Sequence, residues 1–284
     1  MEKILVIGAT GSVGFEVAKL LADSNKPVKI AVRDPERAKS INLTNAKLVH
    51  FEYQNPDTFD SAFDDIEKLL IVSPPSYLNL QELVKKAIDA SIAKGVKLIV
   101  NISAISADSE LDRPIKEIED HIKNSGVDFV ILRPNCYMQN FKDLFRTLII
   151  EDNEISVPAH NAKTSFIDIR DVAQVAVKAL SDNKLSKQII KLTGKQLLNM
   201  YVVAHLFSEA LNREIEYHDI SEDLFEKSLR SAGWPAGTIM GTLQLCSHIK
   251  KGETALITDS VERILKREPI KFDQFIKDYS DNWK

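Results

Sequence analysis

The sequence lacks the features that mark membrane, secreted or nucleic-acid-binding proteins. Its 284 residues include only two cysteines and no Cys-x-x-Cys pair, which argues against a disulfide scaffold or a zinc ribbon. No apolar run reaches the roughly 18 residues of a transmembrane helix, and no signal peptide is visible. The net charge is −4, and no long block of one sign supports nucleic-acid binding. We expect a cytoplasmic protein with no metal, membrane or nucleic-acid partner.

Glycine is also scarce, with 10 residues against a usual share of about 7%. Three of the ten, Gly8, Gly11 and Gly14, lie between an apolar run at 3–7 and a segment with helical spacing of apolar residues. Glycines at a strand-to-helix turn let the backbone approach a pyrophosphate at the helix N-terminus. The residues expected to hold it are Gly8, Ala9, Thr10, Gly11, Ser12 and Val13.

Short apolar runs alternate with helical patterns over the first half of the chain. Strands are predicted at 3–7, 28–32, 47–51, 69–72, 96–102 and 128–132. Such alternation is typical of an α/β fold, here a Rossmann-type doubly wound parallel sheet.

The second half is less regular. We expect an NAD(P)-binding domain at 1–155, with 166–192 packing back on it, and a further strand at 166–170. A smaller, mostly helical substrate or partner domain would occupy 195–284.

A basic residue follows the second predicted strand. Arg33 lies 19 residues after Gly14, where an NAD-specific site places an acid that holds the ribose 2′-hydroxyl. A guanidinium suits a 2′-phosphate instead, so we expect preference for NADP over NAD. The alternative is that Arg33 is a solvated loop charge and Asp34 contacts the ribose.

Several short motifs run through the chain. They are Gly8 to Gly14, Val32 to Pro35, Val100 to Ala104, Leu132 to Asn135, Tyr137 to Asn140, Phe166 to Ala173, Leu192 to Gly194, Ser231 to Pro235 and Lys251 to Glu253. Together they resemble the NmrA-like family of atypical short-chain dehydrogenases/reductases. That family includes NAD(P)H-dependent quinone reductases, triphenylmethane dye reductases and NADP-binding regulators with little or no catalysis.

The resemblance extends the expected cofactor site beyond the glycine turn. It implies contacts from the segment after the fourth strand, where the Pro74-Pro75 pair departs from the family and leaves Ser73 to make polar contacts. Ser103 follows the fifth strand, in the place of the serine of short-chain dehydrogenases. The nicotinamide end would reach Asn135 and Asn140, although Asn140 is equally well explained as a structural helix residue.

The sequence lacks the Tyr-x-x-x-Lys pair that standard short-chain dehydrogenases use for catalysis. None of the six tyrosines is followed four residues later by lysine, so the pair that lowers a tyrosine pKa for proton exchange is missing. Tyr137 is the best candidate for a proton donor or a stacking wall. The alternative is an aromatic side chain at the edge of a pocket that serves only packing.

Two functions from different classes stay open. The first is an NADPH-dependent reductase that transfers hydride to an electrophilic, conjugated small molecule such as a quinone or a dye, because such acceptors need mainly positioning and a dry pocket. The second is a noncatalytic NADP sensor that binds a protein partner through its second domain. The glycine turn fits both.

Overall fold

The structure is a computed structural model that describes residues 3–36, 38, 41, 43–74 and 78–284. The chain divides into two compact units, and each is described by itself. Unit 1 comprises Met1–Arg133 and Val172–Lys191, and unit 2 comprises Pro134–Asp171 and Leu192–Lys284.

This division differs from the predicted domains. Residues 134–155 belong to unit 2, whereas the prediction kept them with the nucleotide-binding domain. The part that returns to unit 1 is 172–191 rather than 166–192. The chain passes between the units three times, at the end of β6, within α6 and at the end of β8, and not at the later point where the sequence pattern weakens.

A seven-stranded sheet forms the centre of unit 1. In spatial order its strands are β3 (Ala46–His50), β2 (Val28–Val32), β1 (Ile4–Ile7), β4 (Lys68–Val72), β5 (Leu98–Ile102), β6 (Asp128–Pro134) and β8 (Gln188–Leu192). The registered pairs from β3 across to β6 are parallel. The doubly wound, Rossmann-type sheet is thus confirmed, and each of the six strands predicted in the first half lies within two residues of its expected bounds.

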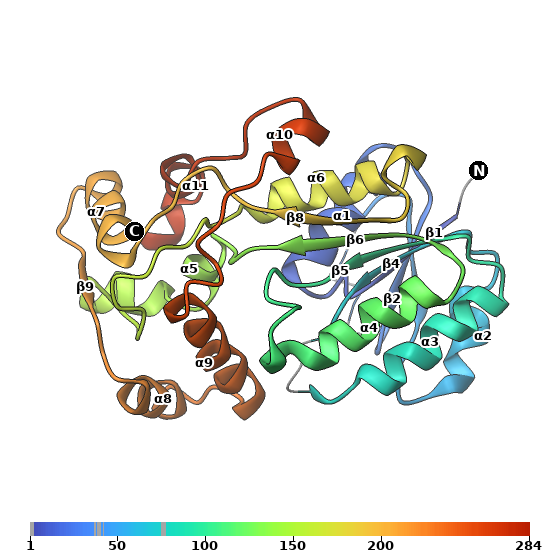
Figure 1. Ribbon diagram of the computed structural model, residues 1–284, viewed down its shortest axis with the longest axis horizontal. Helices are drawn as coiled ribbons and strands as arrows, with labels where there is room; N and C mark the ends of the chain where they lie inside the picture. Colours follow the sequence, from blue (N-terminus) through green and yellow to red (C-terminus); the bar gives the residue numbers. More distant parts are fainter. Residues whose placement is uncertain (1–2, 37, 39–40, 42, 75–77) are drawn as a thin grey trace. The chain divides into compact units, whose positions relative to one another are not determined.

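Helices cover both faces of the sheet, which explains why its central strands are apolar throughout. Unit 1 contains α1 (Ser12–Asp23), α2 (Phe59–Phe63), α3 (Gln81–Ala93), α4 (Arg113–Asn124) and most of α6 (Ile169–Ala179), with 3-10 turns η2 (Pro56–Thr58), η4 (Glu110–Asp112) and η6 (Asn183–Leu185). Figure 1 shows α3 and α4 over one face and α6 with α1 over the other. On the first face, Phe63, Ile88 and Ile122 join one buried cluster with strand residues.

Unit 2 is mostly helical. It contains α5 (Asn140–Asp143), the π-helical turn η5 (Leu148–Asp152), β7 (Glu154–Ser156), α7 (Met200–Leu211), β9 (Glu216–His218), α8 (Glu222–Ser231), α9 (Ala236–Lys250), α10 (Ser260–Leu265), α11 (Phe272–Asp278) and the 3-10 turn η7 (Ser280–Trp283). Strands β7 and β9 pair in parallel. Its core is aromatic: the Phe141 ring packs edge-on against Phe272 at 5.2 Å and against Phe166 at 5.4 Å.

Two local features of the second half bear on the sequence pattern. The motif Ser231 to Pro235 separates α8 from α9: Gly233 has φ +75°, and Pro235 is the N-cap of α9. The strand expected at 166–170 is wrong. Ile167 makes a single parallel bridge to Tyr137, and α6 begins at Ile169, so the apolar alternation there reflects burial in a loop and a helix start.

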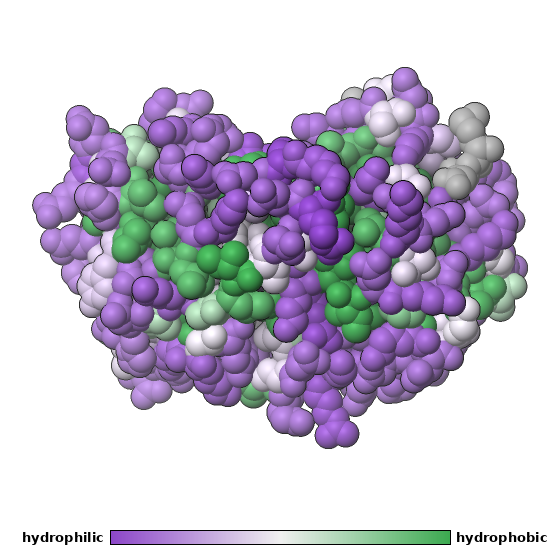
Figure 2. All heavy atoms as spheres, turned by 45° about the horizontal axis from the view of Figure 1, so that its top comes forward, coloured by the Kyte–Doolittle hydropathy of each residue, from purple (hydrophilic) through white to green (hydrophobic). Residues whose placement is uncertain are grey.

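The face drawn in Figure 2 is predominantly hydrophilic, with hydrophobic side chains in separate patches. Within the described residues, no helix combines the length and the apolar character that crossing a bilayer requires.

Candidate functional site

The carboxyl ends of β1 and β4 are neighbours at the point where the strand order reverses. From β1 the chain adds β2 and β3 on one side, and then places β4, β5 and β6 on the other. Ligands of open parallel sheets bind in the crevice at such a switch point. The predicted site residues of unit 1 follow these strands, with Gly8 after β1, Arg33 after β2, Ser73 after β4 and Ser103 after β5.

The chain's own packing requires two of the three clustered glycines. Gly8 has φ +93°, and a Cβ there would lie 2.9 Å from the Val72 Cβ. A Cβ on Gly14 would lie 2.3 Å from the Gly8 carbonyl oxygen, far inside contact distance. Gly8 thus makes the turn and brings it against β4, and Gly14 lets α1 approach that turn.

Gly11 is different, because none of the described residues requires a glycine there. Its φ of −95° and ψ of 163° are extended values that other residues adopt. A Cβ would meet only the Gly8 carbonyl oxygen, at an ordinary 3.5 Å. Gly11 is exposed and is the N-cap of α1, and as a glycine it offers no side chain to the N–H groups of the first turn. The turn therefore combines a glycine that local packing does not require with a helix N-terminus that favours an anion.

The remaining turn residues divide by burial. Thr10 and Ser12 are exposed, whereas Ala9 and Val13 are 0% and 6% exposed. The Ala9 and Val13 side chains therefore belong to the core of unit 1, and any contact they make with a ligand comes from their backbone.

Arg33 is exposed at the end of β2. It forms no ion pair with another described residue. Its neighbour Asp34 has a structural task, because its Oδ1 accepts a hydrogen bond from the Glu36 backbone N–H at 3.0 Å. This bond belongs to a turn at residues 34–36 and occupies one oxygen of the carboxylate that was the alternative ribose ligand.

Ser73 is held at the end of β4 by its neighbours in β5. Its backbone N–H donates to the Ile102 carbonyl at 2.9 Å. Its Oγ accepts a hydrogen bond from Asn101 Nδ2 at 2.8 Å. Pro74 is described, but Pro75, the second proline of the predicted segment, lies outside the described residues.

Asn101 is a residue that the sequence prediction passed over. It is 0% exposed, and its Oδ1 has no hydrogen-bond partner among the described residues. An unpaired buried acceptor costs about 1–3 kcal/mol of stability, so a polar residue at this place needs an explanation outside the core. The signal was visible in the sequence as one polar side chain in the apolar strand Leu98–Ile102.

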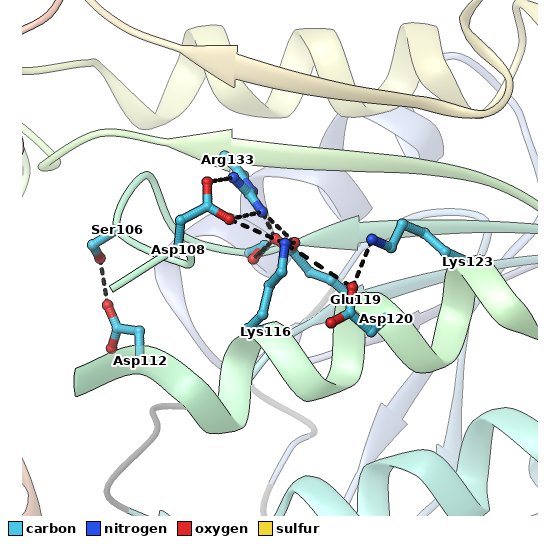
Figure 3. A network of polar contacts seen from close by, with 9 residues as sticks. Ser106, Asp108, Asp112, Lys116, Glu119, Asp120, Lys123 and Arg133 are labelled. Carbon is cyan, nitrogen blue, oxygen red and sulfur yellow. Dashed lines mark hydrogen bonds and ion pairs between the residues drawn. The ribbon is translucent and has the colours of Figure 1, made fainter. Parts of the chain in front are cut away.

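Ser103 contacts a partly buried ionic network, whose members Asp108, Lys116, Glu119 and Arg133 are shown in Figure 3. Its hydroxyl donates to Glu119 Oε1 at 2.5 Å, and Glu119 on α4 is 0% exposed. Arg133, at 3% exposure, donates through Nε to Glu119 Oε1 at 2.8 Å and through Nη1 to Asp108 Oδ2 at 2.6 Å. Lys116 also pairs with Asp108, at 3.0 Å. The Arg133 hydrogen bond lowers the pKa of Asp108 well below its ordinary value.

This network fixes what Ser103 can do. Since its only hydroxyl hydrogen is on the side of the Glu119 carboxylate, Ser103 can offer a ligand only lone pairs. It is therefore a hydrogen-bond acceptor, and it is unsuited to act as a proton donor.

In unit 2, Asn135 is almost fully engaged within the protein. Its Nδ2 donates to Ser165 Oγ at 2.8 Å and to the Thr254 carbonyl at 2.9 Å. Its Oδ1 accepts from the Cys136 backbone N–H at 2.8 Å, and the residue is 2% exposed. Both amide hydrogens are thus used, and only Oδ1 could also reach a cofactor. Burial raises the pKa of the Cys136 thiol to about 12.

Tyr137 and Asn140 stand at the start of a short helical segment. Tyr137 is half-buried and bridges to Ile167. Burial, with a smaller contribution from Cys136, raises the pKa of its phenol above the ordinary value. Asn140 is half-buried at the first position of α5, and its backbone N–H donates to the Tyr137 carbonyl at 3.2 Å. The structure therefore gives Asn140 a backbone role in the turn.

Two of the quoted motifs connect to each other inside unit 2. Gln139 Nε2 donates to Asp168 Oδ1 at 2.8 Å, and its Oε1 accepts from the Ile169 backbone N–H at 3.0 Å. Asp168, which is 0% exposed, also accepts from Arg170. These contacts join the segment after β6 to the start of α6. Within the described residues, no three His, Cys, Asp or Glu side chains gather closely enough to hold a metal ion.

Known proteins are similar to this chain in sequence and in fold. The NmrA-like family profile matches residues 1–276. An NAD(P)H azoreductase of Xenophilus azovorans is 29% identical over 96% of each chain. The structure of Citrobacter sp. triphenylmethane reductase complexed with NADP(H) superposes with a TM-score of 0.87 at 20% identity, over 98% of this chain and 99% of that one.

A regulator has the same fold. The negative transcriptional regulator NmrA, in complex with NADP, gives a TM-score of 0.78 at 16% identity, over 97% of this chain and 94% of that one. At these identities the two solved structures establish the fold alone. The profile, by contrast, extends from the glycine turn of unit 1 to α11 of unit 2, and on that ground the chain belongs to the NmrA-like family.

Proposed function

We propose that this protein is an NADPH-dependent reductase that transfers hydride to an electrophilic, conjugated small molecule of the quinone, azo or dye type. The observation that carries the cofactor assignment is a glycine at position 11 that the packing of the described residues does not require, at an N-terminus of α1 to which it offers no side-chain cap. A space that a Cβ would fill, beside N–H groups that attract an anion, suits a pyrophosphate. The azoreductase relative supports the reaction class.

Each predicted residue then has a task that its surroundings allow. The backbone from Gly8 to Val13 would bind the pyrophosphate, and Arg33 would pair with the 2′-phosphate. Ser73 would donate a hydrogen bond, and Ser103 would accept one. Asn140 would contact the nicotinamide end, while Asn135 shapes the segment before it and has only Oδ1 to offer. NADPH supplies the hydride.

Proton transfer makes small demands on this chain. A strongly electrophilic acceptor is reduced once it is positioned beside the cofactor, and its product can take a proton from water or a weak donor. Tyr137 is the donor that we propose. A tyrosine phenol is protonated at neutral pH, and burial, which raises the pKa of Tyr137, makes it a hydrogen-bond donor and a weak acid.

The reaction is tested by following NADPH absorbance with purified protein and a panel of quinones, azo dyes and triphenylmethane dyes. We expect NADPH oxidation that depends on both the protein and the acceptor. Tight NADPH binding without turnover on any acceptor would instead favour the noncatalytic NADP sensor. The observation that favours this second function is that Ser103 is an acceptor only, which removes one acid from the site.

Cofactor preference is expected to depend on Arg33. The substitution Arg33→Ala removes the positive charge opposite the 2′-phosphate. We expect NADPH affinity to fall by about 10- to 100-fold, which corresponds to the loss of one charge-assisted hydrogen bond. NADH affinity should not change, because NADH lacks that phosphate. Calorimetry with both nucleotides measures this. Arg113→Ala is a matched control, since Arg113 is exposed and pairs with Glu117 at 3.5 Å. If the ratio of NADPH affinity to NADH affinity did not change, the alternative that Asp34 contacts the ribose would be favoured.

Tyr137→Phe is expected to lower kcat about tenfold with little change in KM, because it removes one weak proton donor and leaves the ring in place. Burial raises the pKa of the phenol, so Tyr137 does not titrate between about pH 6 and pH 9. The pH profile of kcat should therefore have the same shape in the variant and in the wild type over that range. Steady-state rates across that range test both points. The control is Tyr201→Phe, at a 56% exposed tyrosine on α7. A variant that kept full kcat would remove Tyr137 as a donor.

A further inference from the structure

We infer that Asn101 is a positioning residue, which sets the Ser73 hydroxyl as a hydrogen-bond donor toward an acceptor oxygen of the nucleotide. The inference rests on the proposed nucleotide site and concerns the residue that sequence analysis did not select. Its basis is the pair of hydrogen bonds from Asn101 Nδ2 to Ser73 Oγ at 2.8 Å and to the Ile71 carbonyl at 3.4 Å.

The direction of the Asn101–Ser73 bond follows from the carbonyl. A backbone carbonyl can only accept, so the amide nitrogen, and not Oδ1, must face Ile71. The same nitrogen faces Ser73 Oγ, and Ser73 therefore accepts from Asn101. A hydroxyl has one hydrogen, and because it is not used in this bond, it is left to point toward a second partner that can accept it.

The position of Ser73 selects that partner. Its backbone is fixed by the bond from its N–H to the Ile102 carbonyl at 2.9 Å. The residue before it, Val72, lies against Gly8, where an added Cβ would be 2.9 Å from the Val72 Cβ. The donor is thus at the strand end beside the glycine turn. The acceptors that a dinucleotide brings to such a turn are phosphate oxygens, and a donor already oriented loses less freedom on binding.

Stability does not explain Asn101. The side chain is 0% exposed in a strand of otherwise apolar residues, and its Oδ1 has no partner among the described residues. Asn135, the buried asparagine of unit 2, differs: its amide makes bonds through both Nδ2 and Oδ1. An imperfectly satisfied polar group beside a ligand site is the signature of a residue retained for function.

The test is a double-mutant cycle on NADPH affinity, with the melting temperature of the ligand-free protein measured in parallel. Asn101→Leu removes the amide at similar volume, and Ser73→Ala removes the hydroxyl. We expect each to weaken NADPH binding about tenfold, which corresponds to one hydrogen bond to a charged acceptor. The double variant should bind no more weakly than either single variant, because Asn101 acts through Ser73.

Stability and a conservative variant separate positioning from a structural role. The melting temperature of Asn101→Leu should equal or exceed that of the wild type, since an unsatisfied acceptor is removed. Ser73→Thr, which keeps the hydroxyl, should retain wild-type affinity. Ser91→Ala is the matched control: Ser91 is 0% exposed and donates to the Ile88 carbonyl at 2.7 Å in α3, so its loss should leave NADPH affinity unchanged.

The outcomes separate this inference from the proposed function. Wild-type protein that binds no NADPH would overturn the proposed function itself. Wild-type binding together with additive losses in the double variant would overturn the inference alone, as would a lowered melting temperature of Asn101→Leu with unchanged affinity.

Discussion

Gly11→Asp is expected to weaken NADPH binding by at least about a hundredfold while the ligand-free protein stays as stable as the wild type. A carboxylate on Gly11 would stand where the pyrophosphate is proposed to bind, and opposing like charges across a binding site costs several kcal/mol. The fold should tolerate the change. Gly11 has an extended backbone and a Cβ would meet its nearest atom at 3.5 Å, and aspartate is a favourable N-cap at a positive helix end.

Gly14→Ala provides the contrast three residues further on. Its Cβ would lie 2.3 Å from the Gly8 carbonyl oxygen, so the turn or the helix must move. We expect a loss of about 2 kcal/mol of stability, with weakened binding as a consequence of the displaced turn. Melting temperatures of the ligand-free proteins and NADPH calorimetry distinguish the two variants. NADPH binding by Gly11→Asp at wild-type affinity would mean that the pyrophosphate site is misplaced. Equal melting temperatures of the two variants would contradict the packing difference between Gly11 and Gly14.

These glycines show which parts of the fold could be predicted from the sequence. Their clustering predicted the turn, because a strand-to-helix connection against a phosphate needs backbone without a Cβ. Strands β1 to β6 could be predicted to within two residues, because parallel strands covered on both faces must be apolar. The same reasoning was wrong at Phe166 to Arg170, where apolar residues line a loop and the start of α6.

The direction of each hydrogen bond could not be predicted from the sequence. Ser73 and Ser103 look alike there, each following a strand of the sheet. Ser73 accepts from Asn101, which leaves a donor, whereas Ser103 donates to Glu119, which leaves an acceptor. The difference arises from partners 28 and 16 residues away along the chain, and only the folded sheet and α4 bring them together.

The ionic network behind Ser103 is expected to matter most for stability. In Arg133→Met the chain loses both guanidinium hydrogen bonds to Glu119. The carboxylate, at 0% exposure, keeps the Ser103 hydroxyl and the more distant Lys116 ammonium at 3.8 Å. Removing one member of a buried ion pair costs about 3–5 kcal/mol, and we expect a loss of that size in urea unfolding at neutral pH. Arg113→Met, at an exposed arginine, should lose less than about 1 kcal/mol.

A second substitution tests the cause of that loss. In Arg133→Met with Glu119→Leu no buried charge is left unpaired, and we expect most of the lost stability to return, because apolar replacements of a buried pair are often neutral.

Acidification gives an independent measure. The pKa of Asp108 is lowered in the folded protein, first by the Arg133 hydrogen bond. Its contribution is therefore present above the ordinary aspartate pKa and is lost as the pH falls toward the lowered value. The wild type should thus lose more stability in acid than Arg133→Met does, and the two unfolding curves should converge. A constant gap between them across the acid range would mean that packing of the arginine side chain, and not its charge, stabilises this part of unit 1.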